Sequence, residues 1–323
     1  MRTARRAWAE VPPALRDEVE QRLGSPVREV EDRRGGFSWG VVGVAALADG
    51  EQVFVKAIQS SPDAVGDHRA EVGVSARLPA AVPAPRLRFG LERDGWLLRC
   101  FDLAPGVLPH EPWLDHELAA ALAMLDACAE ALTPSPITGV PTVAARMAGR
   151  CETWRALERD GTHDVVSVAA LGAWEREHLR LLAAIEARWA ELVVGDTLLH
   201  FDPRFDNILI DDHGTARLVD WSRACTGPAW VDLVCLLMES DLGARDPQEI
   251  FLASPAGRDA DPLRVDAFLV ALGGYWTHTA ALTGPAHAPH LRERREHSRR
   301  ATMSWLRSRW AADGAAPTVG AVR

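Results

Sequence analysis

Strand-forming and helix-forming segments occupy different parts of this chain, and the break between them limits the folds that it can adopt. Up to residue 101 the apolar runs are short, rich in β-branched residues and separated by turn sequences. Residues 102–112 (DLAPGVLPHEP) then concentrate proline and glycine, as a linker or hinge does. Beyond this segment most apolar residues recur at helical spacing. We therefore expect an α+β, bilobal fold, with a small lobe over residues 1–101 and a larger, mostly helical lobe over residues 102–323.

The small lobe is expected to hold an antiparallel sheet. Asp49-Gly50 separates two runs rich in β-branched residues, and a second pair, Asp94-Gly95, lies within residues 86–101. Asp-Gly supplies the positive φ angles that a tight hairpin turn needs, so each pair predicts a hairpin. With a helix at about residues 63–78, the lobe would contain five strands and a helix. The predicted strands cover residues 27–34, 41–47 and 51–58, followed by two within residues 86–101.

The large lobe is expected to be helical except for one embedded hairpin. Two short apolar runs in residues 196–220 are joined by Asp-Asp-His-Gly, which predicts that hairpin. The Ala/Gly/Val-rich tail after Asp313 has the composition of a disordered end. The predicted helices cover residues 114–132, 167–194, 228–242, 262–282 and 287–312.

The net charge and the cysteine content indicate which partners and which cellular compartment the protein is expected to have. The 323-residue chain has a net charge of −9, which makes nucleic acid a poor partner. An acidic surface suits a cationic small molecule, although solubility alone would explain it. The five cysteines form no CxxC pair, which predicts reduced thiols rather than a disulfide or zinc framework. Since no signal-peptide-like or membrane-spanning run is found, we expect a cytoplasmic protein without a membrane partner; no oligomeric state is predicted.

Acids and an amide gather at the ends of the embedded hairpin, in residues 200–207 (HFDPRFDN) and at Asp220. Asn207 and Asp220 flank the hairpin, so their side chains can converge at its open end. An amide oxygen and a carboxylate are hard ligands that suit Mg²⁺ bridging substrate phosphates. Asp202, five residues before Asn207, can share the site without being a ligand. Its position suits a base that orients an incoming hydroxyl group.

Residues 200–207, followed by Asp220-Trp221, resemble the H-G-D-x-x-x-x-N catalytic loop and the metal-binding pair of the aminoglycoside phosphotransferase family. Phe201 stands where that family usually has glycine. Residues 227–233 (GPAWVDL) are similar to the family's G-x-P-x-x-D-L segment. The resemblance covers about residues 30–240. It implies a protein-kinase-like fold, ATP or alternatively GTP as the phosphoryl donor, and Mg²⁺ as the metal.

One lysine stands out within this family pattern. The chain has 36 lysine and arginine residues, and only Lys56, in the run VFVKAI, is a lysine. Its place resembles that of the family's third-strand lysine, which contacts the α- and β-phosphates of ATP, with Glu71 as its carboxylate partner. An ammonium is a compact point charge, and a slot shaped for it between phosphates would not admit the wide guanidinium fork of arginine. The alternative is an ordinary solvated lysine at a strand end.

Two further nucleotide contacts follow from the resemblance. A glycine-rich turn between the first two strands would cover the phosphates, with a plain turn as the alternative. Residues 97–103, which include Cys100, would form the hinge that holds adenine through backbone groups. The residues of the covering loop are Gly35, Gly36, Ser38 and Gly40.

The remaining polar residues of this region have structural or functional interpretations. As in the family, His200 is expected to brace the catalytic loop and Asp232 to anchor its backbone. Arg204 could stabilise charge on the transferring phosphoryl group or form a surface salt bridge. Asp206 could contact the substrate, although a solvated loop acid is the simpler interpretation. Residues 292–300 (RERREHSRR) mix charges and predict a solvated helix face.

These features predict an ATP-dependent O-phosphotransferase that phosphorylates a hydroxyl group of a small molecule. The family resemblance favours an antibiotic, such as an aminoglycoside, with resistance or self-protection as the role. The acid-rich residues 239–241 could then meet substrate amines, or be ordinary surface. The alternatives are a metabolic kinase of an amino alcohol or sugar, and a nucleotide-binding pseudokinase. The presence of Lys56, Asp202 and both metal-ligand candidates argues against the pseudokinase.

Overall fold

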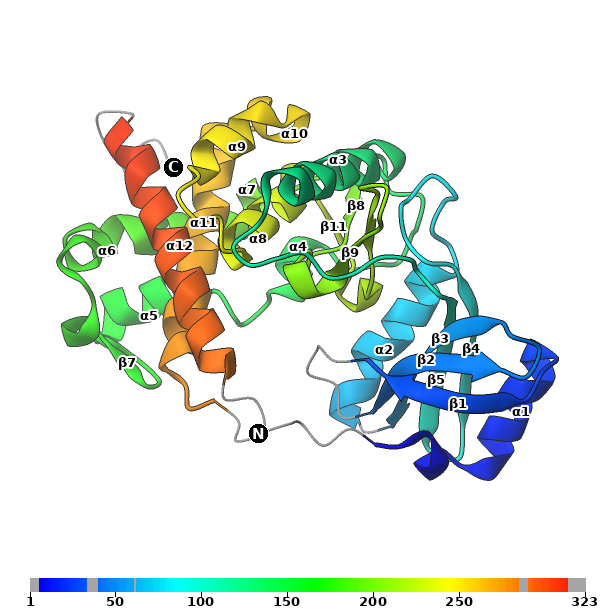
Figure 1. Cartoon of the computed structure of the whole chain (residues 1–323). Coiled ribbons are helices and arrows are strands. Elements are labelled where there is room, and N and C mark those ends of the chain that lie inside the picture. The colour runs from blue at the N-terminus through cyan, green and yellow to red at the C-terminus, as the bar shows by residue number, and fades with distance from the viewer. Residues whose placement is uncertain (1–5, 34–39, 61, 285–289, 313–323) are drawn as a thin grey trace.

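The computed structural model describes residues 6–33, 40–60, 62–284 and 290–312, and Figure 1 shows a small sheet-containing lobe beside a larger helical one. The small lobe holds a five-stranded antiparallel sheet in the order β1-β2-β3-β5-β4. This arrangement confirms the predicted α+β class. The strands are β1 (Val27–Asp32), β2 (Val41–Leu47), β3 (Gln52–Gln59), β4 (Leu87–Arg93) and β5 (Trp96–Asp102).

Both Asp-Gly pairs turn the chain as predicted. Asp94 and Gly95 have φ angles of +51° and +72°. Positive φ at both turn positions produces a twist that matches two antiparallel strands. At the other turn Gly50 has a φ of +95°, and the Asp49 carboxylate accepts a hydrogen bond from the Glu51 N–H at 3.0 Å. The short acidic side chain therefore closes the turn that joins β2 to β3.

The two faces of the sheet have different neighbours because side chains alternate along each strand. On one face Val53, Val55 and Ala57 of β3 are buried in a core shared with helix α1 (Pro13–Leu23). The opposite face is covered by helix α2 (Pro62–Ser75). Lys56 falls on this second face. The alternation thus directs the single lysine of the chain toward α2 and the large lobe.

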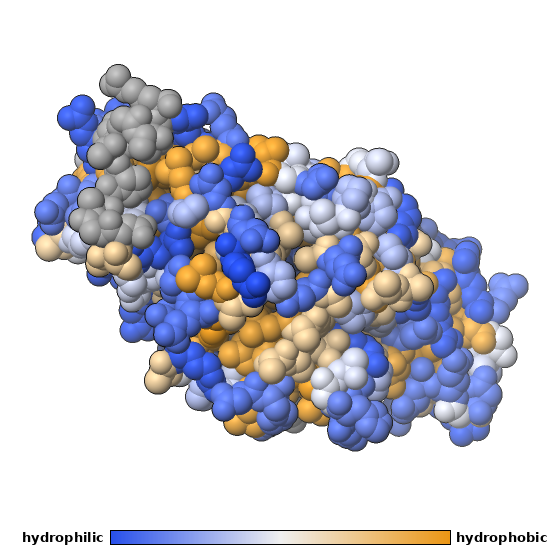
Figure 2. All heavy atoms as spheres, turned by 90° about the horizontal axis from the view of Figure 1, so that it is seen from above, coloured by the Kyte–Doolittle hydropathy of each residue, from blue (hydrophilic) through white to orange (hydrophobic). Residues whose placement is uncertain are grey.

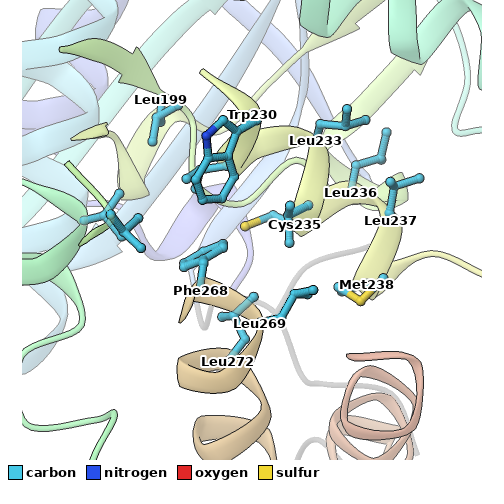
Figure 3. Packing of buried hydrophobic residues seen from close by; sticks show 14 of the residues in the cluster. Leu199, Trp230, Leu233, Cys235, Leu236, Leu237, Met238, Phe268, Leu269 and Leu272 are labelled. Carbon is cyan, nitrogen blue, oxygen red and sulfur yellow. The ribbon is translucent and has the colours of Figure 1, made fainter. Parts of the chain in front are cut away.

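The large lobe is built from helices around an apolar core. The helices are α3 (Asp115–Ala131), α4 (Val143–Arg146), α5 (Thr153–Asp160), α6 (Ala173–Glu186), α7 (Trp189–Leu192), α8 (Trp230–Glu239), α9 (Pro247–Ala253), α10 (Pro255–Arg258), α11 (Pro262–Ala281) and α12 (His290–Ala312). Figure 3 shows part of the core, where the rings of Trp230 and Phe268 lie 5.9 Å apart between α8 and α11. Removing such rings from water is the main favourable contribution to folding.

The prediction of one long helix over residues 167–194 is wrong. A small hairpin of β6 (Thr162–His163) and β7 (Val166–Ser167) precedes α6, which begins only at Ala173. A break at Arg188 then separates α6 from α7. Both helices bury one side in the same core, so apolar residues keep helical spacing across the break and periodicity does not reveal it. Helices α1, α4, α5, α9 and α10 were not predicted, and the tail after Asp313 lies outside the described residues.

The predicted embedded hairpin is present. Strand β9 (Ile208–Ile210) pairs with β10 (Ala216–Leu218), with Ile208 opposite Leu218. This register places Asn207 and Asp220 at the same end of the hairpin, just outside the paired residues. A second pair, β8 (Thr197–Leu199) with β11 (Cys225–Gly227), flanks the segments that enter and leave the hairpin.

The sequence analysis also made predictions about membrane-spanning segments and about the cysteine thiols. Figure 2 shows hydrophilic residues interspersed with apolar ones on the face that it presents. None of the described helices is both long and apolar enough to cross a membrane. All five cysteines are buried free thiols, as the lack of CxxC pairs predicted.

Candidate active site

A cleft of about 580 Å³ receives side chains from both lobes. The sheet lines it from one side, and the embedded hairpin with the segment after β5 lines it from the other. A cleft of this size is typical of small-molecule and cofactor sites. The lining residues used below are Val44, Phe54, Lys56, Glu71, Leu103, Ala104, Asp206, Asn207, Leu209 and Asp220.

Lys56 joins the two lobes inside this cleft. Its Nζ lies 2.9 Å from Glu71 Oε1 on α2 and 3.1 Å from Asp220 Oδ2 in the large lobe. The side chain of Lys56 is 11% exposed and that of Glu71 is 1% exposed. The interpretation of Lys56 as a solvated strand-end lysine is therefore wrong.

A second cation shares Glu71, and the sequence analysis missed it. Arg99 of β5 donates to Glu71 Oε2, and its side chain is only 1% exposed. Arg99 lies opposite Lys56 in the pairing of β3 with β5. The signal was an arginine inside the apolar run of a central strand, because an arginine is almost never fully buried without a partner.

Asp220 adopts an unusual backbone conformation beside Lys56. Its φ and ψ of +69° and +63° lie in the left-handed region, which residues other than glycine rarely occupy. Burial alone would raise the pKa of its carboxyl group. Lys56, Ser222 and Arg99 outweigh burial and hold the pKa of Asp220 well below its usual range. The carboxylate is therefore ionised at neutral pH.

The catalytic loop places Asp202 and Asn207 in direct contact. Asn207 Nδ2 donates to the backbone oxygen of Asp202 at 2.8 Å and to its Oδ2 at 3.2 Å. These bonds commit the amide nitrogen to Asp202, so the amide oxygen is left to accept from or ligate another group. Burial raises the pKa of Asp202, and the positive charge of Arg204 opposes that rise.

Side-chain contacts to the backbone hold the catalytic loop in shape. Asp232 accepts hydrogen bonds from the N–H groups of His200 and Phe201, each at 2.8 Å. His200 Nε2 lies 2.9 Å from the Val219 oxygen, and its Nδ1 accepts from the Asp202 N–H at 3.2 Å, the pattern of a neutral imidazole. Phe201 has a φ of +66°, the conformation for which the family usually has glycine. The predicted bracing by His200 and anchoring by Asp232 are confirmed.

Arg204 and Asp206 are not surface residues. Arg204 Nε lies 3.4 Å from Asp202 Oδ1 and 3.1 Å from Asp206 Oδ1. The Asp206 side chain is 7% exposed, and Arg294 of α12 approaches it at 3.6 Å. The interpretations of Asp206 as a solvated loop acid, of Arg204 as a surface ion pair and of residues 292–300 as a wholly solvated face are therefore wrong.

Of residues 239–241, which could meet substrate amines, only Asp241 is exposed. Glu239 Oε2 lies 3.6 Å from Arg294 Nη2, and Ser240 is buried. Burial raises the pKa of Glu239 to about 7, and the nearby charge of Asp202 adds to the rise. Glu239 is thus part of the charge network behind the catalytic loop rather than a surface that awaits substrate amines.

The predicted covering loop is only partly described. Gly35, Gly36 and Ser38 lie outside the described residues. Gly40 directly precedes β2, and a Cβ atom there would lie 2.0 Å from the Ala57 oxygen of β3. The close approach of the two strands therefore accounts for glycine at this position.

Of the predicted adenine hinge, residues 97–103, only the last part lines the cleft, and Cys100 does not. Cys100 is fully buried in the core on the α1 side of the sheet, away from the cleft. It pairs with Val55 of β3 and with Phe89 of β4, since β5 continues as far as Asp102. Phe101, Asp102 and Leu103 of the predicted range line the cleft, together with Ala104 just beyond it.

Asn207 and Asp220 offer an amide oxygen and a carboxylate at one edge of the cleft. Magnesium in phosphate-transfer sites takes few protein ligands and completes its shell with phosphate and water oxygens. These two donors fit that role. In the part of the chain that the structure describes, no group of three or more His, Cys, Asp or Glu side chains could hold a metal ion. An amide oxygen and a carboxylate at one edge of the cleft suit a metal that binds together with phosphates.

Comparison with known protein families places most of the chain within one of them. A model of the phosphotransferase enzyme family matches residues 43–282. No curated protein sequence matches the chain.

Solved structures share the fold at low sequence identity. A thermostable mutant of the aminoglycoside phosphotransferase APH(4)-Ia, with ADP and hygromycin B, is 15% identical, with a TM-score of 0.56 over 91% of this chain and 98% of that one. Choline kinase LicA from Streptococcus pneumoniae is 13% identical, with a TM-score of 0.58 over 91% and 98% of the two chains. Spectinomycin phosphotransferase APH(9)-Ia, with ADP and spectinomycin, is 12% identical, with a TM-score of 0.55 over 92% and 97%. These likenesses confirm the predicted kinase-like fold.

Proposed function

The chain belongs to the phosphotransferase enzyme family, and we propose that it transfers the γ-phosphoryl group of ATP to a hydroxyl group of a small molecule. The observation that carries this proposal is the 3.1 Å contact between Lys56 Nζ and Asp220 Oδ2 inside the cleft. It brings together a cation suited to phosphates and a carboxylate suited to a metal. Phosphoryl transfer asks the protein mainly for positioning and charge neutralisation, which such a pair supplies.

The small lobe, over residues 1–101, would bind most of the nucleotide. Val44, Phe54 and Leu209 line the cleft and would bury a purine ring. Leu103 and Ala104 follow the last strand of the sheet, where backbone groups can turn to a ligand. GTP is the alternative donor and belongs in the same assay.

Lys56 would donate to the α- and β-phosphates, with Glu71 fixing its direction. Asn207 and Asp220 would hold Mg²⁺, which when bound offsets the charge that develops on the phosphate oxygens. Asn207 has a second task, because its amide nitrogen fixes Asp202. One side chain thus couples the metal position to that of the proposed base.

Asp202 would orient the acceptor hydroxyl group and receive its proton. Burial favours the protonated form of this carboxyl group, which cannot act as a base. Arg204, 3.4 Å away, opposes that effect and would also face charge on the transferring phosphoryl group. Arg204 therefore supports the chemistry in two ways that both follow from its position between Asp202 and Asp206.

We propose two classes of acceptor molecule and rank them. An antibiotic stands first because the sequence resembles antibiotic phosphotransferases, with resistance or self-protection as the role. An amino alcohol or sugar stands second. The pairing of Glu239 with Arg294 weakens one argument for a cationic acceptor, since that acid already has a cationic partner. Because ATP is the donor and the thiols are free, we propose the cytoplasm as the compartment.

The test uses purified protein with ATP or GTP and Mg²⁺. A thermal-shift titration measures nucleotide binding, and a transfer assay then covers aminoglycosides, macrolides, nucleoside and peptide antibiotics, choline, homoserine and sugars. Transfer to an antibiotic supports the first acceptor class, and transfer only to an amino alcohol or sugar supports the second. Binding without transfer to any alcohol indicates a pseudokinase. Failure to bind Mg²⁺–nucleotide contradicts the proposal.

A further inference from the structure

The carboxylate of Glu71 is shared by two buried cations. Lys56 Nζ lies 2.9 Å from its Oε1, and Arg99 Nη1 donates to its Oε2. The two cations stand opposite each other on β3 and β5. Each carboxylate oxygen therefore has its own charged donor, and such bonds are roughly twice as strong as those between neutral groups.

Arg99 also fixes the helix that carries Glu71. Its Nη1 lies 2.6 Å from His68 Nδ1, and a guanidinium can only donate, so Nδ1 is the acceptor. Burial lowers the pKa of His68 to about 4, which keeps the ring neutral at ordinary pH. His68 and Glu71 are three residues apart on α2 and lie on one face. One guanidinium thus contacts two successive turns of the helix.

Helix α2 is tied to the large lobe as well. Asp67 Oδ1 lies 2.8 Å from Arg146 Nη1, and its Oδ2 lies 3.5 Å from Arg223 Nη1. Figure 1 shows α2 between the sheet and the large lobe. Through Arg99, the same helix is attached to the centre of the sheet. The position of α2 therefore sets how Glu71 and Lys56 meet the catalytic loop.

When phosphates enter the cleft, the Lys56 ammonium cannot keep both of its carboxylate contacts and also contact the phosphates. Its ammonium already contacts Glu71 and Asp220. Phosphates would draw it away from these carboxylates, and a buried carboxylate without its cation costs several kcal/mol. Arg99 is 1% exposed on a central strand, so it cannot follow Lys56 toward the ligand. It would remain on Glu71.

We propose that Arg99 is a positioning residue for the nucleotide phosphates: it keeps Glu71 neutralised and in place while Lys56 turns from Asp220 to the phosphates. The inference rests on the proposed function, because it presupposes a nucleotide in the cleft. Arg99 does not line the cleft and would not contact the nucleotide. Its loss should therefore weaken phosphate binding and spare adenosine binding.

The single lysine allows a residue-specific test. Acetic anhydride treatment followed by peptide mass spectrometry reports on Lys56 separately from the α-amino group. The concentration of ATP with Mg²⁺ that halves the rate of Lys56 acetylation measures phosphate engagement. Arg99→Met should raise that concentration about tenfold. The affinity for adenosine, measured by calorimetry, should change less than twofold.

Arg69→Met is the matched control. Arg69 joins the same helix to the same sheet through Glu92, and more than half of its side chain is exposed, so both affinities should stay within twofold. Arg99→Lys should recover part of the loss, and it carries the same comparison if Arg99→Met does not fold. Unchanged ATP protection in the Arg99 variants, or an equal loss of ATP and adenosine affinity, would overturn the inference. A lack of ATP protection in the wild-type protein would instead overturn the proposed function.

Discussion

The two halves of the candidate active site handle charge in opposite ways. In the small-lobe half, one carboxylate, that of Glu71, is neutralised by Lys56 and Arg99. In the large-lobe half, the carboxylates outnumber the cations that contact them. There burial raises the pKa of Asp202 and brings that of Glu239 to about 7.

The difference indicates a division of labour. Arg99 is buried on an inner strand and cannot rearrange easily, so the small-lobe half keeps a positive charge on Glu71 while Lys56 turns to the phosphates. In the large-lobe half burial shifts the pKa of Asp202 upward, and a higher pKa makes a carboxylate a better acceptor for the proton of a hydroxyl group. Binding of phosphates and chemistry on the acceptor should therefore respond to different substitutions.

The largest expected effect tests whether phosphate binding and chemistry on the acceptor depend on different halves of the site. Asp202→Ala should lower kcat for transfer about 10³-fold, because the proposed base is lost, while ATP affinity stays within about threefold. Steady-state kinetics with the acceptor found in the panel assay, together with calorimetry for ATP, measure both quantities. Asp259→Ala, at an exposed loop acid, is the control and should change neither. A parallel loss of kcat and ATP affinity would contradict the division.

Asp220 stands at the boundary of the halves and should affect binding more than Asp202 does. Asp220→Asn should weaken Mg²⁺-dependent ATP binding roughly a hundredfold, because both the metal ligand and the contact with Lys56 lose their charge. Thermal-shift titrations with and without Mg²⁺ separate the metal-dependent part. An active variant with unchanged Mg²⁺ dependence would refute the metal assignment.

A smaller effect is expected from the anchor of the catalytic loop. In Asp232→Asn, an amide nitrogen would face the N–H of His200 or Phe201, so one buried donor loses its acceptor. We expect the free energy of unfolding to fall by about 2 kcal/mol, measured by urea denaturation. The loss should lower kcat more than ATP affinity. A variant with wild-type stability would show that the loop holds its shape without this anchor.

The smallest effect concerns pH. Between about pH 4.5 and 7 the folded protein keeps a proton on Glu239 that the unfolded chain has released, so the free energy of unfolding falls as pH rises through this window. Glu239→Gln should remove this contribution. The fall in the free energy of unfolding from pH 5 to pH 8 should then be about 1 kcal/mol smaller in the variant than in the wild type. Denaturant titrations at both pH values measure the difference.

The control for this experiment is Glu191→Gln, at an exposed glutamate. It should keep the wild-type pH dependence. If Glu239→Gln also keeps the wild-type pH dependence, Glu239 is ionised in the folded protein. The two halves of the site would then differ less in the charge of their carboxyl groups.

Local signals predicted the parts of the fold that local chemistry controls. Gly50 and the pair Asp94-Gly95 specify their turns because few other residues tolerate the positive φ angles found there. The spacing from Asp202 to Asn207 and Asp220 likewise predicted a shared hairpin end, as found. The helix prediction for residues 167–194 failed because periodicity reports burial of one side and not the continuity of the backbone.

The sequence by itself identified the residues that we propose to meet phosphates and a metal. A lone lysine on an alternating strand and a short loop with acids at fixed spacing leave little freedom in where those side chains point. The tertiary structure alone decided which cations neutralise which acids. Arg99 reaches Glu71 from an adjacent strand, and Arg294 reaches Asp206 from a helix near the chain's end. The strength of such pairs depends on distance and burial, which are properties of the assembled fold and not of the order of residues.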